Sequence, residues 1–166
     1  ACVAESTFST ADSGDVCSAV STCAAGQGRD ALGTVSTDRT CRACVAETDY
    51  SSADDGAACA AVTPCPAGKY ISVAGTTTAD RTCTTCPDGQ YQASANQSGC
   101  TACASGKYQT SGNKGEAEST ACATCADGTY NAATTGVATC TNCAAGKYGG
   151  SGARTSESHC DTCALG

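Results

Sequence analysis

The chain has 166 residues, 17 of them cysteine, and a formal net charge of −7 spread thinly along its length. Ile, Leu, Val and Phe together number twelve, too few for their burial to offset the conformational entropy of ordering the chain. This composition excludes an ordinary globular core and predicts a disulfide scaffold of an oxidising, extracellular compartment. It also argues against a nucleic-acid partner, because no cluster of Lys and Arg is present to contact phosphates.

The chain starts at Ala1-Cys2 with neither a charged nor an apolar leader region, as expected of a secreted product whose signal peptide has been removed. No run of residues approaches the 18 apolar positions of a membrane-spanning helix, so we expect no span in this segment.

The first half of the chain repeats itself with a shift of 42 residues, and this is the main organisational signal. Ser36-Thr-Asp-Arg-Thr-Cys41 matches Thr78-Ala-Asp-Arg-Thr-Cys83. Within this period lies a shorter unit of about 20 residues that opens with one cysteine and contains a second cysteine farther along. The pattern predicts repeats 1 to 4 at 2–22, 23–43, 44–64 and 65–85.

The second half continues the same pattern, so residues 1–166 are expected to form one continuous array of about eight units. Repeats 5 to 8 are predicted at 86–102, 103–124, 125–142 and 143–162, with 163–166 as the start of a ninth. Cys163 is the odd cysteine: either the chain continues beyond Gly166, or Cys163 bonds to another molecule.

The aromatic residues follow the opening cysteines by five or six positions, and a glycine precedes most of the tyrosines. The aromatics are Phe8, Tyr50, Tyr70, Tyr91, Tyr108, Tyr130 and Tyr148, and the glycines are Gly68, Gly89, Gly106, Gly128 and Gly146. Repeat 2 has Gly28 in place of an aromatic. We interpret the glycines as turn positions with positive φ. The aromatics either pack over a disulfide as the miniature core of each unit or form a stacking ladder for a ligand.

Repeats of this size, rich in Ala, Gly, Ser and Thr and without helical periodicity, predict short strands and turns. The expected fold is therefore small and disulfide-rich: an elongated tandem-repeat rod of short β-strands and turns with little or no helix, in which each unit contacts its neighbours.

The cysteine spacing favours bridges across the longer loop of each repeat. The short gap between repeats changes from Cys140-x2-Cys143 to Cys17-x5-Cys23, whereas the second cysteine of a repeat follows the first by 14 to 19 residues throughout. The bridges predicted in this way are Cys2–Cys17, Cys23–Cys41, Cys44–Cys59, Cys65–Cys83, Cys86–Cys100, Cys103–Cys122, Cys125–Cys140 and Cys143–Cys160.

Two alternatives to these bridges remain open at this point. Neighbouring cysteines such as Cys41 and Cys44 could pair with each other. Pairs of Cys-x2-Cys motifs separated by about 20 residues are also a zinc signature. If the cysteines form the eight predicted disulfide bridges, the protein needs no metal and no cofactor. A thioredoxin-like redox role would need a βαβ unit, which the sequence pattern does not show.

The segments Cys65-Pro-Ala-Gly-Lys-Tyr70 and Cys86-Pro-Asp-Gly-Gln-Tyr91 resemble a known pattern. They are similar to the cysteine-rich repeats of ephrin-receptor-like and tumour-necrosis-factor-receptor-like modules, in which the opening cysteine bonds to the second one. The six-cysteine modules of the latter family have inner crossed bridges that this chain lacks. The simple tandem form resembles repeats of large extracellular surface proteins.

Further candidate sites are sparse. Asn96-Gln97-Ser98 is an N-glycosylation sequon, and Ser and Thr make up about a quarter of the chain, either as O-glycan acceptors or as small polar filler. His159 beside Cys160 is expected to be a solvent-exposed side chain rather than half of a catalytic pair. The acidic groups at Asp12–Asp15 and Asp54–Asp55 lack the spacing of a calcium loop.

Taken together, the sequence predicts no enzyme. We expect a secreted or cell-surface structural protein, a building block of a filament, coat or appendage that can carry glycans. Its expected partners are itself or other extracellular proteins. The alternative is a ligand-binding receptor ectodomain or surface antigen.

Overall fold

The computed structural model describes residues 2–3, 6–9, 16–109, 112–133, 136–150 and 152–162. The chain divides into two compact bodies, each considered by itself below. The first body comprises 1–63 with 73–82, and the second comprises 64–72 with 83–166.

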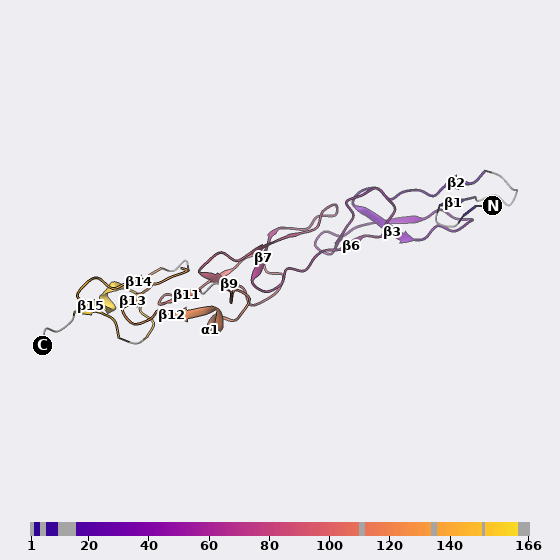
Figure 1. Ribbon diagram of the computed structural model, residues 1–166. Helices are drawn as coiled ribbons and strands as arrows, with labels where there is room; N and C mark the ends of the chain where they lie inside the picture. The colour runs from indigo at the N-terminus through magenta and orange to yellow at the C-terminus, as the bar shows by residue number, and fades with distance from the viewer. Residues whose placement is uncertain are drawn as a thin grey trace. The chain divides into compact units, whose positions relative to one another are not determined.

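Each repeat contains one pair of short strands, and the sheets have two strands each (Figure 1). The pairs are β1 (Thr7–Phe8) with β2 (Ser18–Ala19), β3 (Gln27–Ala31) with β4 (Thr40–Ala43), β5 (Asp49–Tyr50) with β6 (Ala60–Ala61), β7 (Lys69–Val73) with β8 (Thr82–Thr85), β9 (Gln90–Tyr91) with β10 (Thr101–Ala102), β11 (Lys107–Gln109) with β12 (Cys122–Thr124), β13 (Thr129–Tyr130) with β14 (Thr141–Asn142), and β15 (Lys147–Tyr148) with β16 (Asp161–Thr162). The pairing is antiparallel wherever its register is defined, and Tyr91 faces Thr101, the residue after the second cysteine of its repeat.

A tight turn leads into the first strand of repeats 2 to 8, and in all of these except repeat 3 it contains a glycine with positive φ. In repeat 4 the N–H of Lys69 donates to the carbonyl of Pro66, and Gly68 between them has φ +81°. A positive φ at the third position of a β-turn is the type II arrangement, which favours glycine. The predicted positive φ is found at all five glycines, from +77° to +82°. Gly26 of repeat 2 has the same conformation, with φ +80°.

Repeat 3 departs from this rule, because Glu47 occupies the glycine position of the turn with φ 64°. An L-residue in this region costs roughly 1–2 kcal/mol. Its partners keep it there: the side chain of Arg81 donates to the Glu47 carbonyl (2.7 Å) and lies 3.2 Å from its carboxylate.

The longer loops contain the helical turns of the described chain. They are α1 (Glu118–Ala121) in repeat 6 and the 3-10 helix η1 (Glu157–His159) in repeat 8. Among the described residues no helix has the length and apolar character to cross a membrane. The prediction of a disulfide-rich fold of short paired strands with little helix is confirmed.

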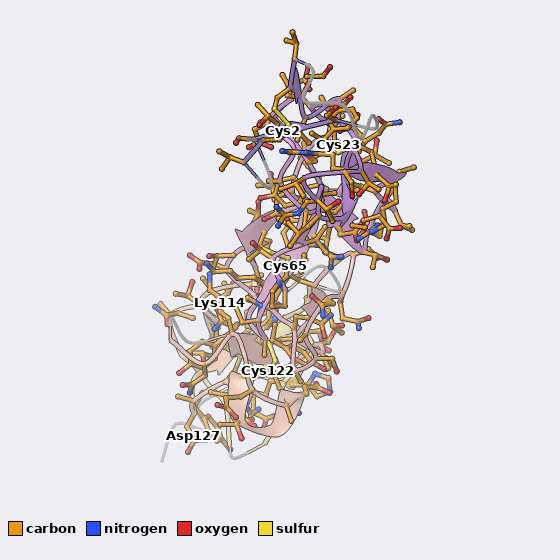
Figure 2. The ribbon with its side chains drawn as sticks, turned by 90° about the vertical axis from the view of Figure 1, so that its right-hand side faces the viewer. Cys2, Cys23, Cys65, Lys114, Cys122 and Asp127 are labelled. Atoms are coloured by element: carbon orange, nitrogen blue, oxygen red, sulfur yellow. A yellow bond between two sulfur atoms is a disulfide. The ribbon has the colours of Figure 1, made fainter. Side chains whose placement is uncertain are left out.

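Disulfide bonds take the place of a hydrophobic core. Eight bridges join the opening to the second cysteine of each repeat: Cys2–Cys17, Cys23–Cys41, Cys44–Cys59, Cys65–Cys83, Cys86–Cys100, Cys103–Cys122, Cys125–Cys140 and Cys143–Cys160. Figure 2 labels four of these cysteines among mostly short side chains. Most of the opening cysteines are fully buried, from Cys65 at 0% to Cys125 at 4% exposed. A closed loop of this length is worth ~3 kcal/mol in the chain-entropy model.

Candidate functional surface: the contacts between repeats

Successive repeats are joined by main-chain hydrogen bonds at the turn glycines, which we call the ladder glycines: Gly26, Gly68, Gly89, Gly106, Gly128 and Gly146. The opening cysteine of the next repeat donates its N–H to the carbonyl of the ladder glycine. These bonds are Cys44 to Gly26 (2.9 Å), Cys86 to Gly68 (2.9 Å), Cys103 to Gly89 (3.0 Å), Cys125 to Gly106 (3.0 Å) and Cys143 to Gly128 (2.7 Å). Each of these five bridges is thereby tied to the turn that precedes it.

The N–H of a ladder glycine is directed at the next repeat as well. It donates to the residue that directly follows the aromatic there: Gly26 to Ser51 (2.8 Å), Gly68 to Gln92 (2.8 Å), Gly106 to Asn131 (2.9 Å) and Gly128 to Gly149 (3.2 Å). The acceptor residue in turn donates its own N–H to a loop carbonyl one repeat farther on: Ser51 to Thr77 (2.9 Å), Gln92 to Lys114 (2.8 Å) and Asn131 to Arg154 (2.9 Å). One chain of bonds therefore links three repeats.

Four of the ladder glycines lie directly against the loop of the repeat two places farther along the chain. A Cβ built on Gly89 would lie 2.3 Å from the nitrogen of Val137, and one on Gly106 would lie 2.8 Å from Ala153. A Cβ on Gly68 would meet Gly115 at 3.1 Å, and one on Gly26 would meet Thr78 at 3.2 Å. Glycine thus serves two purposes here: it adopts the turn conformation, and it leaves room for the chain two repeats away.

Tyr91 packs on the disulfide of the following repeat, and Tyr108 lies near one. Tyr91 of repeat 5 packs against the buried cluster of Cys103, Ala121 and Cys122 in repeat 6. Tyr108 of repeat 6 lines a shallow depression together with Cys140 of repeat 7. The packing of Tyr91 thus extends beyond its own unit. Its contact joins two units.

Gly28 explains why repeat 2 lacks an aromatic. A Cβ at this position would lie 2.1 Å from the nitrogen of Cys59 and 2.5 Å from its Sγ. The Cys44–Cys59 bridge of repeat 3 is pressed against the backbone of repeat 2, so no side chain fits between them.

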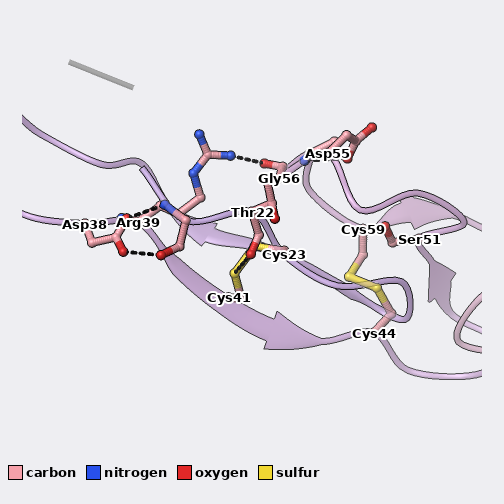
Figure 3. The surroundings of a disulfide bond; sticks show 12 residues. Thr22, Cys23, Asp38, Arg39, Cys41, Cys44, Ser51, Asp55, Gly56 and Cys59 are labelled. Atoms are coloured by element: carbon pink, nitrogen blue, oxygen red, sulfur yellow. Dashed lines mark hydrogen bonds between the residues drawn. A yellow bond between two sulfur atoms is a disulfide. The ribbon is translucent and has the colours of Figure 1, made fainter. Parts of the chain in front are cut away.

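Two equivalent arginines cross to repeat 3 in the first body. Arg39 donates from its guanidinium to the carbonyl of Gly56 (3.1 Å), and Figure 3 shows this bond beside the two neighbouring bridges. Arg81, its equivalent in the matched Asp-Arg-Thr segment, donates to the carbonyl of Glu47 (2.7 Å). A Cβ built on Gly56 would overlap the Arg39 guanidinium, at 1.6 Å from Nη1. Glycine at 56 therefore makes room for the cation.

The aspartates beside these arginines bond to the end of the preceding repeat, two residues before the opening cysteine of their own repeat. The backbone N–H and the hydroxyl of Ser21 donate to the carboxylate of Asp38, and Thr63 makes the same two bonds to Asp80. The side-chain hydrogen bond from Ser21, with that from its backbone, lowers the pKa of Asp38. The bonds from Thr63 lower the pKa of Asp80 in the same way. Hydrogen bonds to the ionised form account for both shifts.

Asn96 of the sequon is exposed and has φ 58°. Its Oδ1 accepts the N–H of Cys65 (2.8 Å), and its own N–H donates to the Cys65 carbonyl (2.9 Å). The sequon asparagine thus fastens repeat 5 to the opening of repeat 4.

His159 is exposed in η1, with Nδ1 2.9 Å from the hydroxyl of Ser156. The neighbouring Cys160 is bonded to Cys143, so its sulfur is not a thiol that the imidazole could activate.

The structure also bears on the metal hypotheses. The atoms of Cys44, Asp49 and Cys59 lie within 4.8 Å of one another, but the two sulfurs form a disulfide and offer no thiolate to a metal. Asp49 instead pairs with Arg42, whose hydrogen bond lowers the pKa of that carboxyl. Asp55 accepts the N–H of Ala57 (2.8 Å) and closes a turn. Cys163 and Asp12–Asp15 lie outside the described residues.

Residues 75–114 match the family model described as Tyrosine-protein kinase ephrin type A/B receptor-like. The match covers the end of repeat 4, all of repeat 5 and the start of repeat 6. It confirms the resemblance of this chain to ephrin-receptor-like cysteine-rich repeats. No curated protein matches the chain. With its eight bridges, the protein is a disulfide-rich repeat domain of an extracellular type.

Proposed function

We propose that this protein is an extracellular structural repeat protein without catalytic activity, a building block of a filament, coat or surface appendage. The proposal rests on the series of main-chain hydrogen bonds that joins each ladder glycine to the repeats that follow it, which we call the main-chain ladder. Because its bonds join backbone groups across successive repeats, they suit an array that extends by adding equivalent units. Its partners are copies of itself or other extracellular proteins.

The exposed side chains support an assembling role. The strands after the second cysteine of a repeat carry mainly Ala and Thr, as in β6 (Ala60–Ala61) and β10 (Thr101–Ala102). Small side chains let neighbouring chains approach closely, and they have little conformational entropy to lose on contact.

Electron microscopy of material taken from its natural source, without refolding, tests the proposal. Long fibres or sheets with a regular axial repeat are the expected result. Isolated particles at every concentration would refute an assembling role.

One observation favours a second function, that of a receptor ectodomain or surface antigen: residues 75–114 match a receptor-like family model. This function predicts saturable binding of a soluble extracellular partner by the isolated chain. Surface plasmon resonance against candidate ligands from the same source would reveal it, with the fully reduced chain as a control that lacks the bridges.

We further propose that Asn96 carries an N-linked glycan. The side chain is exposed, and attachment through Nδ2 leaves Oδ1 able to accept the N–H of Cys65. Mass spectrometry of the peptide around Asn96 from the natural source should show a glycan that peptide N-glycosidase removes. An unmodified peptide would contradict this.

A further inference from the structure

We infer that a surface hollow lined by Lys69 and Lys114, which we call the lysine hollow, binds the acidic turn at Asp54 and Asp55 of a second copy of this chain. The inference rests on the proposed assembling function and specifies its partner and surface. It is argued from the distribution of charge between odd-numbered and even-numbered repeats, which runs through the whole chain.

The cations and the carboxylates are divided unequally between the two sets of repeats. All nine Lys and Arg residues lie in repeats 2, 4, 6 and 8, together with seven of the carboxylates. Repeats 1, 3, 5 and 7 carry the other nine carboxylates and no cation. The formal charges of the even and odd sets are therefore +2 and −9, which together give the net charge of −7. Electrostatics thus favours contacts between odd and even repeats over contacts between two odd repeats.

Ion pairs between repeats within the chain already follow this division. In the first body, Arg81 of repeat 4 lies 3.2 Å from the carboxylate of Glu47 in the turn of repeat 3. In the second body, Lys114 of repeat 6 lies 2.8 Å from the carboxylate of Asp88 in the turn of repeat 5. A cation of an even repeat holding an acidic turn of an odd repeat is therefore a recurring contact of this fold.

The lysine hollow lies in the second body, between the turn of repeat 4 and the loop of repeat 6. Its volume is about 360 Å³, and three glycines, Gly68, Gly112 and Gly115, line it together with the two lysines. Because glycine has no side chain, a turn of another chain can approach the backbone closely here. Repeats 4 and 6 are both preceded and followed by further repeats, so the hollow belongs to the interior of the array.

The two lysines differ in their contacts. Lys114 donates from Nζ to the carbonyl of Cys86 (2.7 Å) and to Asp88 (2.8 Å), which fixes its position and leaves one of its three N–H donors. Lys69 is exposed, and no ion pair joins it to another residue that the structure describes. Lys69 therefore supplies the uncompensated positive charge of the hollow.

The acidic turn is the matching surface on repeat 3. Glu47 and Asp49 of this repeat pair with arginines of even repeats. Asp54 and Asp55 are exposed, and neither forms an ion pair within the described part of the chain. Asp55 accepts the N–H of Ala57 (2.8 Å), which fixes the turn beside Gly56 (Figure 3). Asp54 is thus the carboxylate that is free to meet Lys69.

The contact can extend from copy to copy. Each chain carries one lysine hollow and one acidic turn on different repeats, so the interface is heterologous and need not close on itself. At physiological ionic strength charges more than about 8 Å apart are largely screened, which weakens the repulsion between two chains of net charge −7 but not the pairs in contact.

Sedimentation equilibrium of charge-reversed full chains tests the inference. Lys69→Glu places like charges at the contact and should weaken self-association about tenfold or more, and Asp54→Lys should do the same. An equimolar mixture of the two variants should associate within about twofold of the parent chain, because each reversed side chain then meets a partner of opposite charge. Misfolding of either variant could not give this recovery.

Asp30→Lys is the matched control. Asp30 is an exposed aspartate of the even repeat 2, and its replacement changes the net charge by the same amount as Asp54→Lys. We expect it to change self-association less than about twofold, since it lies outside both surfaces. An effect as large as that of Asp54→Lys would mean that net charge, and not this contact, controls association, and would overturn the inference.

The remaining outcomes separate this inference from the proposed function. Association that both single variants leave unchanged, or a mixture as weak as its components, would overturn the contact while leaving other modes of assembly intact. A parent chain that stays monomeric at all concentrations would also overturn it, whatever microscopy of the natural material shows. Microscopy alone decides the proposed function.

Discussion

At the residue scale, Gly28 shows how closely one repeat is pressed on the next. Alanine at this position would place a Cβ 2.1 Å from the nitrogen of Cys59, a main-chain atom that cannot rotate away. We expect Gly28→Ala to lower the free energy of unfolding by about 1–3 kcal/mol or more. Thermal denaturation under non-reducing conditions measures the loss.

Gly99→Ala is the control for this substitution. No described atom lies within 4 Å of a Cβ at Gly99, and its backbone is outside the left-handed region. We expect stability within about 0.5 kcal/mol of the parent protein. Equal effects of the two alanines would show that the contact between repeats 2 and 3 is looser than described.

Asp80 should make stability depend on pH. Its hydrogen bonds from Thr63 hold its folded pKa below the unfolded value. The resulting stabilisation is complete above the unfolded pKa, near 4, and is lost as the pH falls through the folded pKa. The melting temperature should therefore fall as the pH drops below about 4.

Asp80→Asn tests this by removing the ionisable carboxylate. The variant should melt at a lower temperature than the parent at pH 7, with a smaller fall on acidification. Asp54→Asn, at an exposed aspartate, should keep the parent's pH profile. A profile unchanged in Asp80→Asn would mean that the bonds to Thr63 do not stabilise the fold.

At the element scale, the turn glycines combine conformation with contact, and the two contributions can be separated. Gly89 and Gly146 share φ +82°. A Cβ built on Gly89 would lie 2.3 Å from the nitrogen of Val137, whereas no described atom lies within 4 Å of one built on Gly146. Alanine should cost about 1–2 kcal/mol at either position for the left-handed conformation. Gly89→Ala should cost a further 1–3 kcal/mol for the clash.

Chemical denaturation at low protein concentration, where chains do not associate, measures this pair of variants. A larger loss for Gly89→Ala than for Gly146→Ala would establish that contacts across two repeats stabilise the fold. Equal losses would reduce the role of these glycines to turn formation.

The sequence predicts the elements better than the contacts between them. The cysteine period and the glycine before most tyrosines are sufficient to predict the hairpins, since a positive φ at a fixed offset has a direct residue signature. The ladder has none, because Ser51, Gln92 and Asn131 take part through main-chain atoms that any residue supplies. For the same reason, spacing alone does not reveal that Tyr91 packs on the next repeat.

The matched Asp-Arg-Thr segments are intermediate between the hairpins, which the sequence predicts, and the contacts between repeats, which it does not. Their recurrence is plain in the sequence, but their roles depend on distant partners. Asp38 binds Ser21, 17 residues away, and Arg39 binds Gly56 at the same separation. A repeated motif predicts that the same kind of contact recurs, but it does not identify the residue that accepts the hydrogen bond. The acceptor of Arg39 is a carbonyl, which leaves no trace in the side-chain pattern.

At the scale of the whole molecule, the question is how far a local defect spreads. If stability is a sum of units and neighbour contacts, opening one repeat should loosen only the repeats that touch it. The double variant Cys103→Ala with Cys122→Ala tests this, because it removes one bridge and leaves no unpaired thiol behind in repeat 6. The cost is about 3 kcal/mol, on the order of a hundredfold in local opening.

Hydrogen–deuterium exchange of the amides of Cys44, Cys86, Cys103, Cys125 and Cys143 reports this spread, because each of them donates to the preceding ladder glycine. In the variant, protection should fall at the amide of Cys125, which donates to Gly106 of the opened repeat, and remain unchanged at that of Cys44. Removing Cys2–Cys17 by the same alanine replacement should leave Cys125 protected. Loss of protection at both amides in either variant would mean that the array unfolds as one cooperative unit. Protection kept at Cys125 would mean that the ladder does not couple repeats 6 and 7. The expected result, a fall confined to the contacting repeats, is the behaviour that lets equivalent units be added to an array without destabilising those already in place.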